Sequence, residues 1–146
     1  MAHESDLRLA RQADLDALFD LDVIAQREEN RREFIAHAVA CGQCWVAMDA
    51  DDTALLLGYG VLDNSFFGQH FIPLIVVRDS ARRRGVGAAL LRGLESRALG
   101  AKLFTSTNAS NLPMQALLEK CGFIGSGQVE NLDEGDPELV FVKIRS

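Results

Sequence analysis

The chain is poor in the residues that mark several classes of protein. Three cysteines, three prolines and one tryptophan occur among its 146 residues, and aromatic residues make up 7%. An odd number of cysteines at this low density excludes a disulfide-stapled scaffold and favours a reducing compartment. The longest apolar runs reach about half of the roughly 20 residues that a membrane-spanning helix requires. We therefore expect a cytoplasmic protein with no membrane partner.

Positively charged residues are fewer than negatively charged ones. The chain has 15 Lys and Arg residues against 21 Asp and Glu residues, which gives a formal net charge of −6. This balance argues against a general affinity for nucleic acid, so any bound anion must be held by a local basic patch. Hydrophobic residues make up 48% of the 146 residues, which suits one substantial core and is too little for two. We expect a single domain that spans residues 1–146.

The hydrophobic pattern alternates between strand and helix signals. Apolar residues at helical spacing predict helices at residues 14–26, 28–42, 82–98 and 111–122. Apolar stretches next to turn signals predict strands at 43–48, 53–63 and 69–77. Further strands are expected at 6–12, 102–108, 123–132 and 138–145. Asp14 is the expected N-cap of the first helix, and Gly42 and Gly122 are expected to end the second and the fourth. The last two strands are expected to form an antiparallel pair.

The segment SARRRGVGAALLRGL, residues 80–94, opens the third of these helices directly after an apolar strand. The start of a helix has unpaired backbone N–H groups and the positive end of the helix dipole, so it suits a phosphate. Gly85 and Gly87 remove side chains that would keep an anion away from those groups. Mobile positive charge comes from Arg82, Arg83 and Arg84. The segment therefore predicts a pyrophosphate cradle, although it lacks the Gly-Lys-Ser/Thr of a P-loop.

Two motifs in this chain resemble those of one known family. The order Ile75-x-Val77-x-x-x-x-Arg82-x-x-Gly85-x-Gly87 resembles the acetyl-CoA signature of the GCN5-related N-acetyltransferases (GNAT). About 30 residues later, Asn111 followed by Leu117-x-Glu119-Lys120-x-Gly122-Phe123 is similar to a second segment of that family. The resemblance implies a mixed α/β fold with a twisted, mostly antiparallel sheet of about seven strands and about four flanking helices. Members of the family often dimerise, so a homodimer is possible.

The resemblance also implies which residues bind acetyl-CoA. Ile75, Val76 and Val77 would line a splayed fourth strand whose free backbone groups pair with the pantetheine arm. The turn that would wrap the pyrophosphate comprises Arg82, Arg83, Arg84, Gly85, Val86, Gly87 and Ala88. Asn111 would contact the arm from the neighbouring helix. No metal is implied.

Two positions at which members of the family place acid–base groups hold other residues here. Leu118 stands where a tyrosine often protonates the leaving thiolate, and Ser106 stands where some relatives have a catalytic glutamate. Expelling a thiolate with a pKa of about 8.5 costs about 2 kcal/mol at neutral pH, whereas freeing an alkylamine with a pKa of about 10.4 costs about 4 to 5 kcal/mol. A base is therefore needed more than an acid.

Two places in the sequence offer a candidate base. Glu130 begins a crowded acidic segment that the family resemblance places near the acceptor site, and whose carboxylates are Glu130, Asp133, Glu134, Asp136 and Glu138. The alternative for this segment is an ordinary solvated turn. His70 lies beside the aromatic loop of Phe66 and Phe67, and its alternative role is structural.

The Cys41-x-x-Cys44 pair, with His37 four residues before it, invites a metal or redox interpretation. A redox pair normally needs a helix N-terminus, and this pair follows the expected end of a helix, where the dipole raises the pKa of a thiol. No second cysteine pair completes a metal site. We therefore expect neither function.

The motifs together predict an acyltransferase. We expect transfer of the acetyl group of acetyl-CoA to an amine by direct attack on the thioester, because no nucleophile-and-base constellation for a covalent intermediate is recognisable. The acceptor would be a small molecule or a protein amine. Two alternatives remain, a CoA-binding sensor or interaction module without chemistry, and a module that binds ATP or GTP through RRRGVG.

Overall fold

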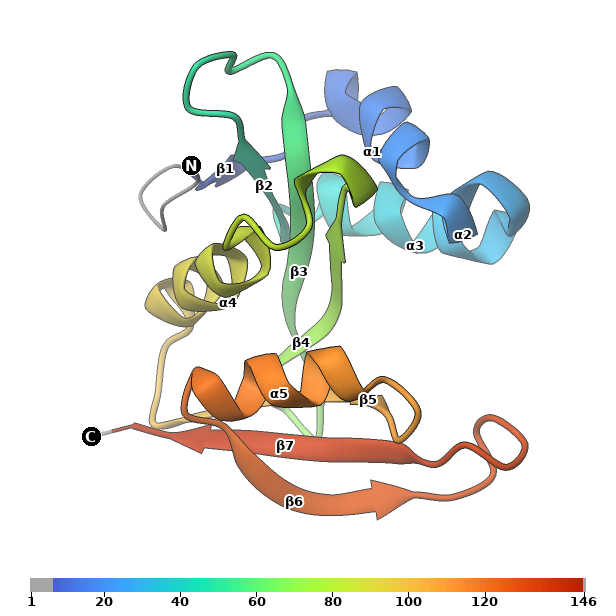
Figure 1. Ribbon diagram of the computed structural model, residues 1–146, viewed down its shortest axis with the longest axis vertical. Coiled ribbons are helices and arrows are strands. Elements are labelled where there is room, and N and C mark those ends of the chain that lie inside the picture. Colours follow the sequence, from blue (N-terminus) through green and yellow to red (C-terminus); the bar gives the residue numbers. More distant parts are fainter. Residues whose placement is uncertain (1–6, 146) are drawn as a thin grey trace.

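A twisted sheet of seven strands forms the centre of the structure, a computed structural model that describes residues 7–145 (Figure 1). The strands are β1 (Leu7–Leu9), β2 (Cys44–Met48), β3 (Leu56–Phe66), β4 (Gln69–Val77), β5 (Lys102–Asn108), β6 (Ile124–Val129) and β7 (Glu138–Ile144). Their order across the sheet is β1-β2-β3-β4-β5-β7-β6, and every neighbouring pair is antiparallel except β4 and β5. The expected mixed α/β class, the number of strands and the antiparallel final pair are confirmed.

Within residues 7–145, five helices flank the sheet, one more than expected. They are α1 (Leu15–Leu21), α2 (Val23–Arg27), α3 (Glu29–Ala40), α4 (Val86–Arg97) and α5 (Leu112–Lys120), with short 3₁₀ turns η2 (Gln12–Asp14) and η3 (Asp79–Ala81). The helix expected over residues 14–26 is interrupted at Asp22, whose backbone is extended at φ −109° and ψ 101°. The Asp22 carboxylate accepts hydrogen bonds from the N–H groups of Ile24 and Ala25, and it thereby starts a new helix.

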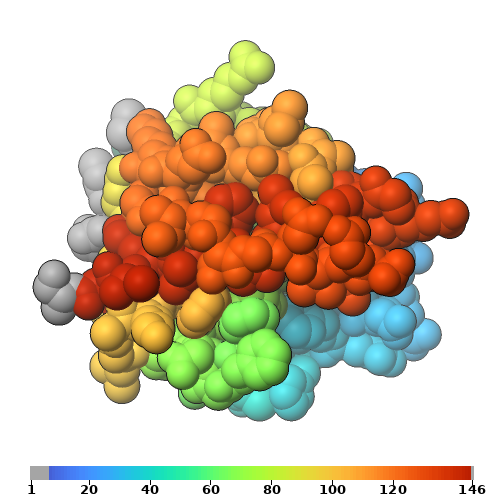
Figure 2. All heavy atoms as spheres, turned by 90° about the horizontal axis from the view of Figure 1, so that it is seen from below, coloured from blue at the N-terminus to red at the C-terminus, as the bar shows by residue number. Residues whose placement is uncertain are grey.

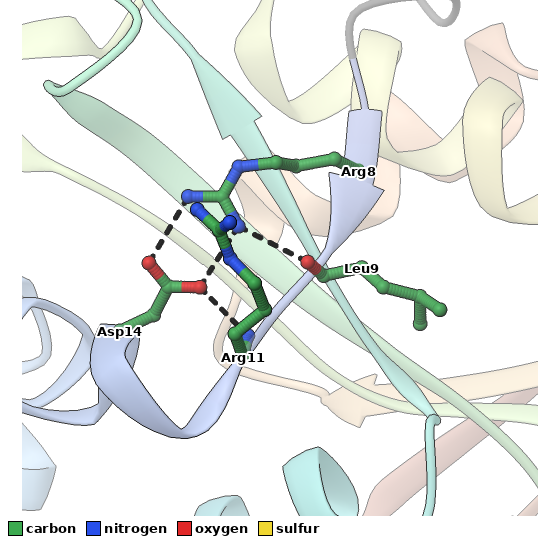
Figure 3. Close-up of polar contacts among 4 residues, drawn as sticks. All are labelled: Arg8, Leu9, Arg11 and Asp14. Carbon is green, nitrogen blue, oxygen red and sulfur yellow. Dashed lines mark hydrogen bonds and ion pairs between the residues drawn. The ribbon is translucent and has the colours of Figure 1, made fainter.

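Asp14 stands at the N-cap of α1, as expected, but its side chain does not cap that helix. Its carboxylate instead accepts two hydrogen bonds from the Arg8 guanidinium, at 2.8 and 3.0 Å, and one from the backbone N–H of Arg11 at 2.7 Å (Figure 3). The expectation of a capping side chain was therefore wrong, because a charged partner on β1 competes for the same oxygens.

The helices cover the sheet unequally (Figure 1). α1, α2 and α3 pack on one face of β2 and β3, where Leu18, Ile35 and Tyr59 are fully buried. α4 packs on the opposite face, and it shares a second hydrophobic cluster with α5, which covers β5 and β7. Within residues 7–145, no helix combines the length and the apolar character that crossing a membrane requires.

The sheet divides in the middle, between β4 and β5. The two strands pair only from His70 with Leu103 to Ile72 with Thr105. At that point β4 carries one more residue than β3 between successive pairs, since Val61 pairs with Leu74 and Asp63 with Phe71. Such a bulge bends the strand. Pro73 lies within the bulge and has no N–H to donate, so β4 turns away from β5 beyond it.

Candidate functional site

A cavity of about 550 Å³ lies between the N-terminal end of α4 and the length of α5. Its walls comprise Ile75, Val77, Ala81, Arg82, Arg83, Gly85, Val86, Gly87, Ala88, Asn111, Pro113, Met114, Leu117 and Lys120. Nine of the eleven residues that the family resemblance assigns to acetyl-CoA are thus brought together around one cavity. Two others, Val76 and Arg84, do not line it.

One wall of the cavity is the unpaired edge of β4. The N–H of Arg78 donates to the carbonyl of Leu57, so the alternation of antiparallel pairing directs the backbone groups of Val76 and Leu74 toward β3. The N–H and C=O groups of Ile75 and Val77 consequently point the other way, into the gap that β5 has left. The side chain of Val76 packs against the α1–α3 cluster. The N–H and C=O groups of two residues of β4, Ile75 and Val77, are therefore free to pair with a ligand in the cavity.

The turn before α4 forms a second wall. Across the part of the chain that the structure describes, no backbone hydrogen bond engages the N–H groups of residues 83–88. Arg83 and Gly85 both have left-handed backbones, at φ 66° and φ 80°. Residues that have a Cβ atom rarely adopt this backbone conformation, so the turn at Arg83 is strained. Six consecutive free N–H groups at a helix N-terminus make a site for an anion.

Glycine is needed at positions 85 and 87 of the turn for two different physical reasons. Gly85 is required by its positive φ, since a Cβ built there would have nothing within 4 Å. At Gly87, a Cβ would stand 2.9 Å from the Cδ2 atom of Leu117, so glycine lets α4 approach α5. Only the second glycine keeps space open beside the cavity.

α5 forms the third wall, which the sequence interpretation largely missed. Asn111 caps this helix, and its side-chain oxygen accepts from the N–H of Met114 at 3.2 Å. Met114, Leu117 and Lys120 follow at three-residue spacing and present one face of the helix to the cavity. That spacing was readable, but nothing in it separates a cavity face from a core face.

Positive charge gathers at one part of the cavity. Arg83 and Lys120 line it, and neither makes an ion pair with any residue in the described range 7–145. Arg82 also lines it and pairs with Asp79 at 3.1 Å, where both side chains are exposed. Arg84 points elsewhere and binds Asp49 at 3.3 Å. Of the three arginines, only Arg83 therefore lines the cavity without a carboxylate partner in the described residues.

The acidic segment that precedes β7 is attached to the end of β5. The hydroxyl of Ser106 donates to Glu138 at 2.7 Å, and the amide of Asn108 donates to Asp133 at 2.8 Å. Ser110 donates to Asp136 through its N–H at 2.9 Å and its hydroxyl at 2.6 Å. Three carboxylates thus anchor this segment to the end of β5, while Glu134 is exposed (the segment is orange-red in Figure 2).

Neither base candidate from the sequence lies at the cavity. Glu130 is exposed and accepts a hydrogen bond from Gln128. His70 lies at the start of β4, where its Nε2 atom accepts from the backbone N–H of Leu99 at 3.1 Å. Leu118, at the expected acid position, is fully buried in the cluster shared by α4 and α5. The structure thus brings none of these three side chains to the cavity.

Cys41 and Cys44 are separated by the fold. Cys41 is exposed at the end of α3, with its sulfur 3.5 Å from Nε2 of His37. Cys44 is buried in β2, and burial raises the pKa of its thiol to about 12. Among the residues that the structure describes, no group of three or more His, Cys, Asp or Glu side chains is arranged to hold a metal ion.

The chain is similar to known acetyltransferases. The model of the acetyltransferase (GNAT) family matches residues 9–123. An acetyltransferase of the GNAT family from Bacillus cereus is 36% identical and has a TM-score of 0.87, with 100% of this chain and 99% of that chain covered. No curated protein sequence matches this chain.

More distant solved structures share the fold. The ribosomal-protein-S18-alanine N-acetyltransferase of Escherichia coli is 19% identical with a TM-score of 0.73, covering 96% of this chain and 93% of that chain. NAA60 from Arabidopsis thaliana, in complex with a bisubstrate analogue, is 19% identical with a TM-score of 0.78, covering 96% of this chain and 97% of that one.

Proposed function

The chain belongs to the GNAT acetyltransferase family, and from this premise we propose that it transfers the acetyl group of acetyl-CoA to an acceptor amine by direct attack on the thioester. The observation that carries the proposal is the cavity between α4 and α5, which is bordered by six free N–H groups on one side and by the free edge of β4 on another. A pyrophosphate needs the first feature, and an amide-containing arm needs the second.

The residues present fit such a donor. The N–H groups of residues 83–88 and the side chains of Arg83 and Lys120 would hold the pyrophosphate. The backbone groups of Ile75 and Val77 would pair with the pantetheine arm, and an N–H in this strand would donate to the thioester oxygen as negative charge develops there. Met114 and Leu117 would cover the arm from α5.

Direct transfer suits this site. Among the residues that the structure describes, no Cys, Ser or His side chain that could form an acyl intermediate lines the cavity. Holding donor and acceptor in one gap supplies orientation, which is the principal catalytic contribution of such an arrangement. The acceptor is an amine of a small molecule or of a protein, and we expect the protein to act in the cytoplasm.

Calorimetric titration of the purified protein with acetyl-CoA, and separately with ATP, tests the donor. We expect saturable binding of acetyl-CoA and competition by ATP only at far higher concentration. Equal affinity for ATP would instead support the nucleotide-binding alternative, and no binding of acetyl-CoA would contradict the proposal.

The chemistry is tested by release of free CoA thiol after mixing with acetyl-CoA and an amine. Spermidine, an aminoglycoside and a short peptide with a free N-terminus sample the acceptor classes. We expect at least one of them to accelerate thiol release above the rate without amine. Tight binding of acetyl-CoA with no acceleration by any of them would favour the alternative of a non-catalytic CoA-binding module, which Leu118 and Ser106 suggest.

A further inference from the structure

The position at which some relatives have a glutamate is occupied by Ser106, yet a carboxylate stands beside it. The hydroxyl of Ser106 donates to Oε2 of Glu138 at 2.7 Å. Glu138 is the first residue of β7 and lies directly opposite Asn108 of β5. It is half-buried, whereas Asp133 and Glu134 in the preceding segment are exposed. Strand β7 thus supplies a carboxyl group beside the position where this chain has serine and some relatives have glutamate.

This carboxylate contacts β5 at the point where β5 begins to border the gap between β4 and β5. The last paired residue of β5 is Thr105, so Ser106 is the first residue beyond the pairing. The side chain of Leu103 packs among α5 residues, so alternation along the strand directs Ser106 to the opposite face. The donor cavity lies on the α5 side. Glu138 therefore borders the gap from the face that the donor leaves free.

We propose that Glu138 is the general base of the reaction and that Ser106 positions it. The inference rests on the proposed function. The carboxylate of Glu138 takes one proton from the acceptor ammonium, directly or through one water molecule. The neutral nitrogen then forms a bond to the thioester carbon, and the C–S bond breaks with its electron pair going to sulfur. The second proton leaves the nitrogen for the thiolate, and Glu138 returns its proton to solvent.

The surroundings of Glu138 suit this role. Its partners on β5, Ser106 and Asn108, are neutral. In the described part of the chain, three carboxylates lie on the segments that flank it, Asp133 and Asp136 in its own segment and Glu130 next to its β6 partner Val129. A cationic amine is drawn toward such a group of carboxylates, and its proton has an acceptor there.

The test compares Glu138→Gln with the matched control Glu134→Gln, which removes a carboxylate of the same exposed segment. With acetyl-CoA and the best amine of the panel near pH 7, we expect Glu138→Gln to lower kcat about 100-fold and Glu134→Gln to leave it unchanged. Acetyl-CoA affinity, measured by titration, should be unchanged in both variants, because neither residue lines the donor cavity.

The pH profile separates a base from a structural residue. The neutral fraction of an alkylamine rises tenfold per pH unit below its pKa of about 10.4. Glu138→Gln should therefore recover most of its rate by about pH 9.5, which a damaged fold would not do. Ser106→Ala removes the hydrogen bond that positions the carboxylate, so its kcat near pH 7 should fall while its rate at about pH 9.5 approaches that of the wild-type protein.

The outcomes distinguish this inference from the proposed function. If the wild-type protein transfers acetyl groups and Glu138→Gln retains its rate, the role of Glu138 is refuted while the function stands. A variant that loses acetyl-CoA binding together with activity, and is not rescued at high pH, would show a structural role instead. If the wild-type protein transfers to no amine, the proposed function itself fails.

Discussion

Asp22 is the residue on which the N-terminal half of the fold depends most. Its carboxylate is 2% exposed and caps α2, and it also accepts from the buried hydroxyl of Tyr59 and lies 3.7 Å from the Arg31 guanidinium. Burial, and then this hydrogen bond, raise the pKa of Tyr59 well above its ordinary value. A single carboxylate thus satisfies groups from α2, α3 and β3.

Replacing Asp22 by alanine should therefore be severely destabilising. The change leaves two N–H groups, a buried hydroxyl and a partly buried guanidinium without their partner, and we expect a loss of about 3 to 5 kcal/mol in the free energy of unfolding. Urea denaturation followed by circular dichroism measures it. Asp20→Ala, at an exposed site on α1, should stay within about 0.5 kcal/mol of the wild-type protein. Equal effects of the two changes would contradict this account of Asp22.

The contribution of Asp14 to the stability of the fold depends on pH. The hydrogen bonds from Arg8, and after them the one from the Arg11 backbone, hold the pKa of this carboxyl below its ordinary value of 3.8 despite partial burial. Because the pKa is lowered in the folded state, the stabilisation is complete above the unfolded pKa and is lost as pH falls through the folded one. We expect Asp14→Asn to cost about 1 kcal/mol at pH 7. In urea titrations the difference should shrink below about pH 4, and a difference that is constant with pH would be inconsistent with the ion pair.

At the scale of elements, the two glycines of the turn into α4 serve different purposes. Gly85 allows the turn to fold, and Gly87 keeps space open beside the cavity. Gly85→Ala puts a Cβ on a backbone at φ 80°. That strain of about 1 to 2 kcal/mol is only partly offset by the lower entropy of the unfolded chain, so we expect a net loss of about 1 kcal/mol in stability. Gly85→Asn, whose side chain tolerates the left-handed region, should lose less.

Gly87→Ala should behave in the opposite way. Its new methyl group meets the flexible end of Leu117 at 2.9 Å and sits in the first turn of α4, where alanine favours the helix. Stability should change by less than about 0.5 kcal/mol, while displacement of Leu117 into the cavity weakens acetyl-CoA binding. Thermal unfolding and calorimetric titration of both variants test the contrast, which would fail if Gly87→Ala bound acetyl-CoA as the wild-type protein does.

The sequence predicted elements better than it predicted their partners. β4 and β5 occupy the expected residues 69–77 and 102–108, because β4 is largely an apolar run and β5 contains Phe and Thr, residues that favour strands. The break at Asp22 was missed because the capping bonds compete with a helical pattern that continues on both sides. The contact between Ser106 and Glu138 joins residues 32 positions apart, and no local pattern encodes such a pairing. Strand residues of this kind are brought together by the pairing of β5 with β7 rather than by their neighbours in the sequence.

At the scale of the whole molecule, the negatively charged acetyl-CoA is attracted by the cationic groups of the cavity and repelled by the net negative charge of the chain. The chain carries a formal net charge of −6, whereas the cavity presents the guanidinium of Arg83 and the ammonium of Lys120. Charges farther away than the Debye length, about 10 Å at 0.1 M salt, are largely screened, while direct contacts are screened less. The contacts at the cavity should therefore dominate, and affinity for acetyl-CoA should fall moderately as salt is raised.

Arg83→Ala and Arg84→Ala form a matched pair for testing this balance, since the two residues are adjacent and only Arg83 lines the cavity. Loss of one charge-assisted contact of about 1.5 kcal/mol should weaken binding about tenfold in Arg83→Ala. Its salt dependence should also flatten, because the remaining repulsion from the acidic body is relieved by salt. Arg84 is bound to Asp49, so Arg84→Ala should bind nearly as the wild-type protein does. Titration of both variants at low and high salt decides the matter, since equal losses would mean that the turn attracts the anion by its total charge rather than by the geometry that directs Arg83 into the cavity.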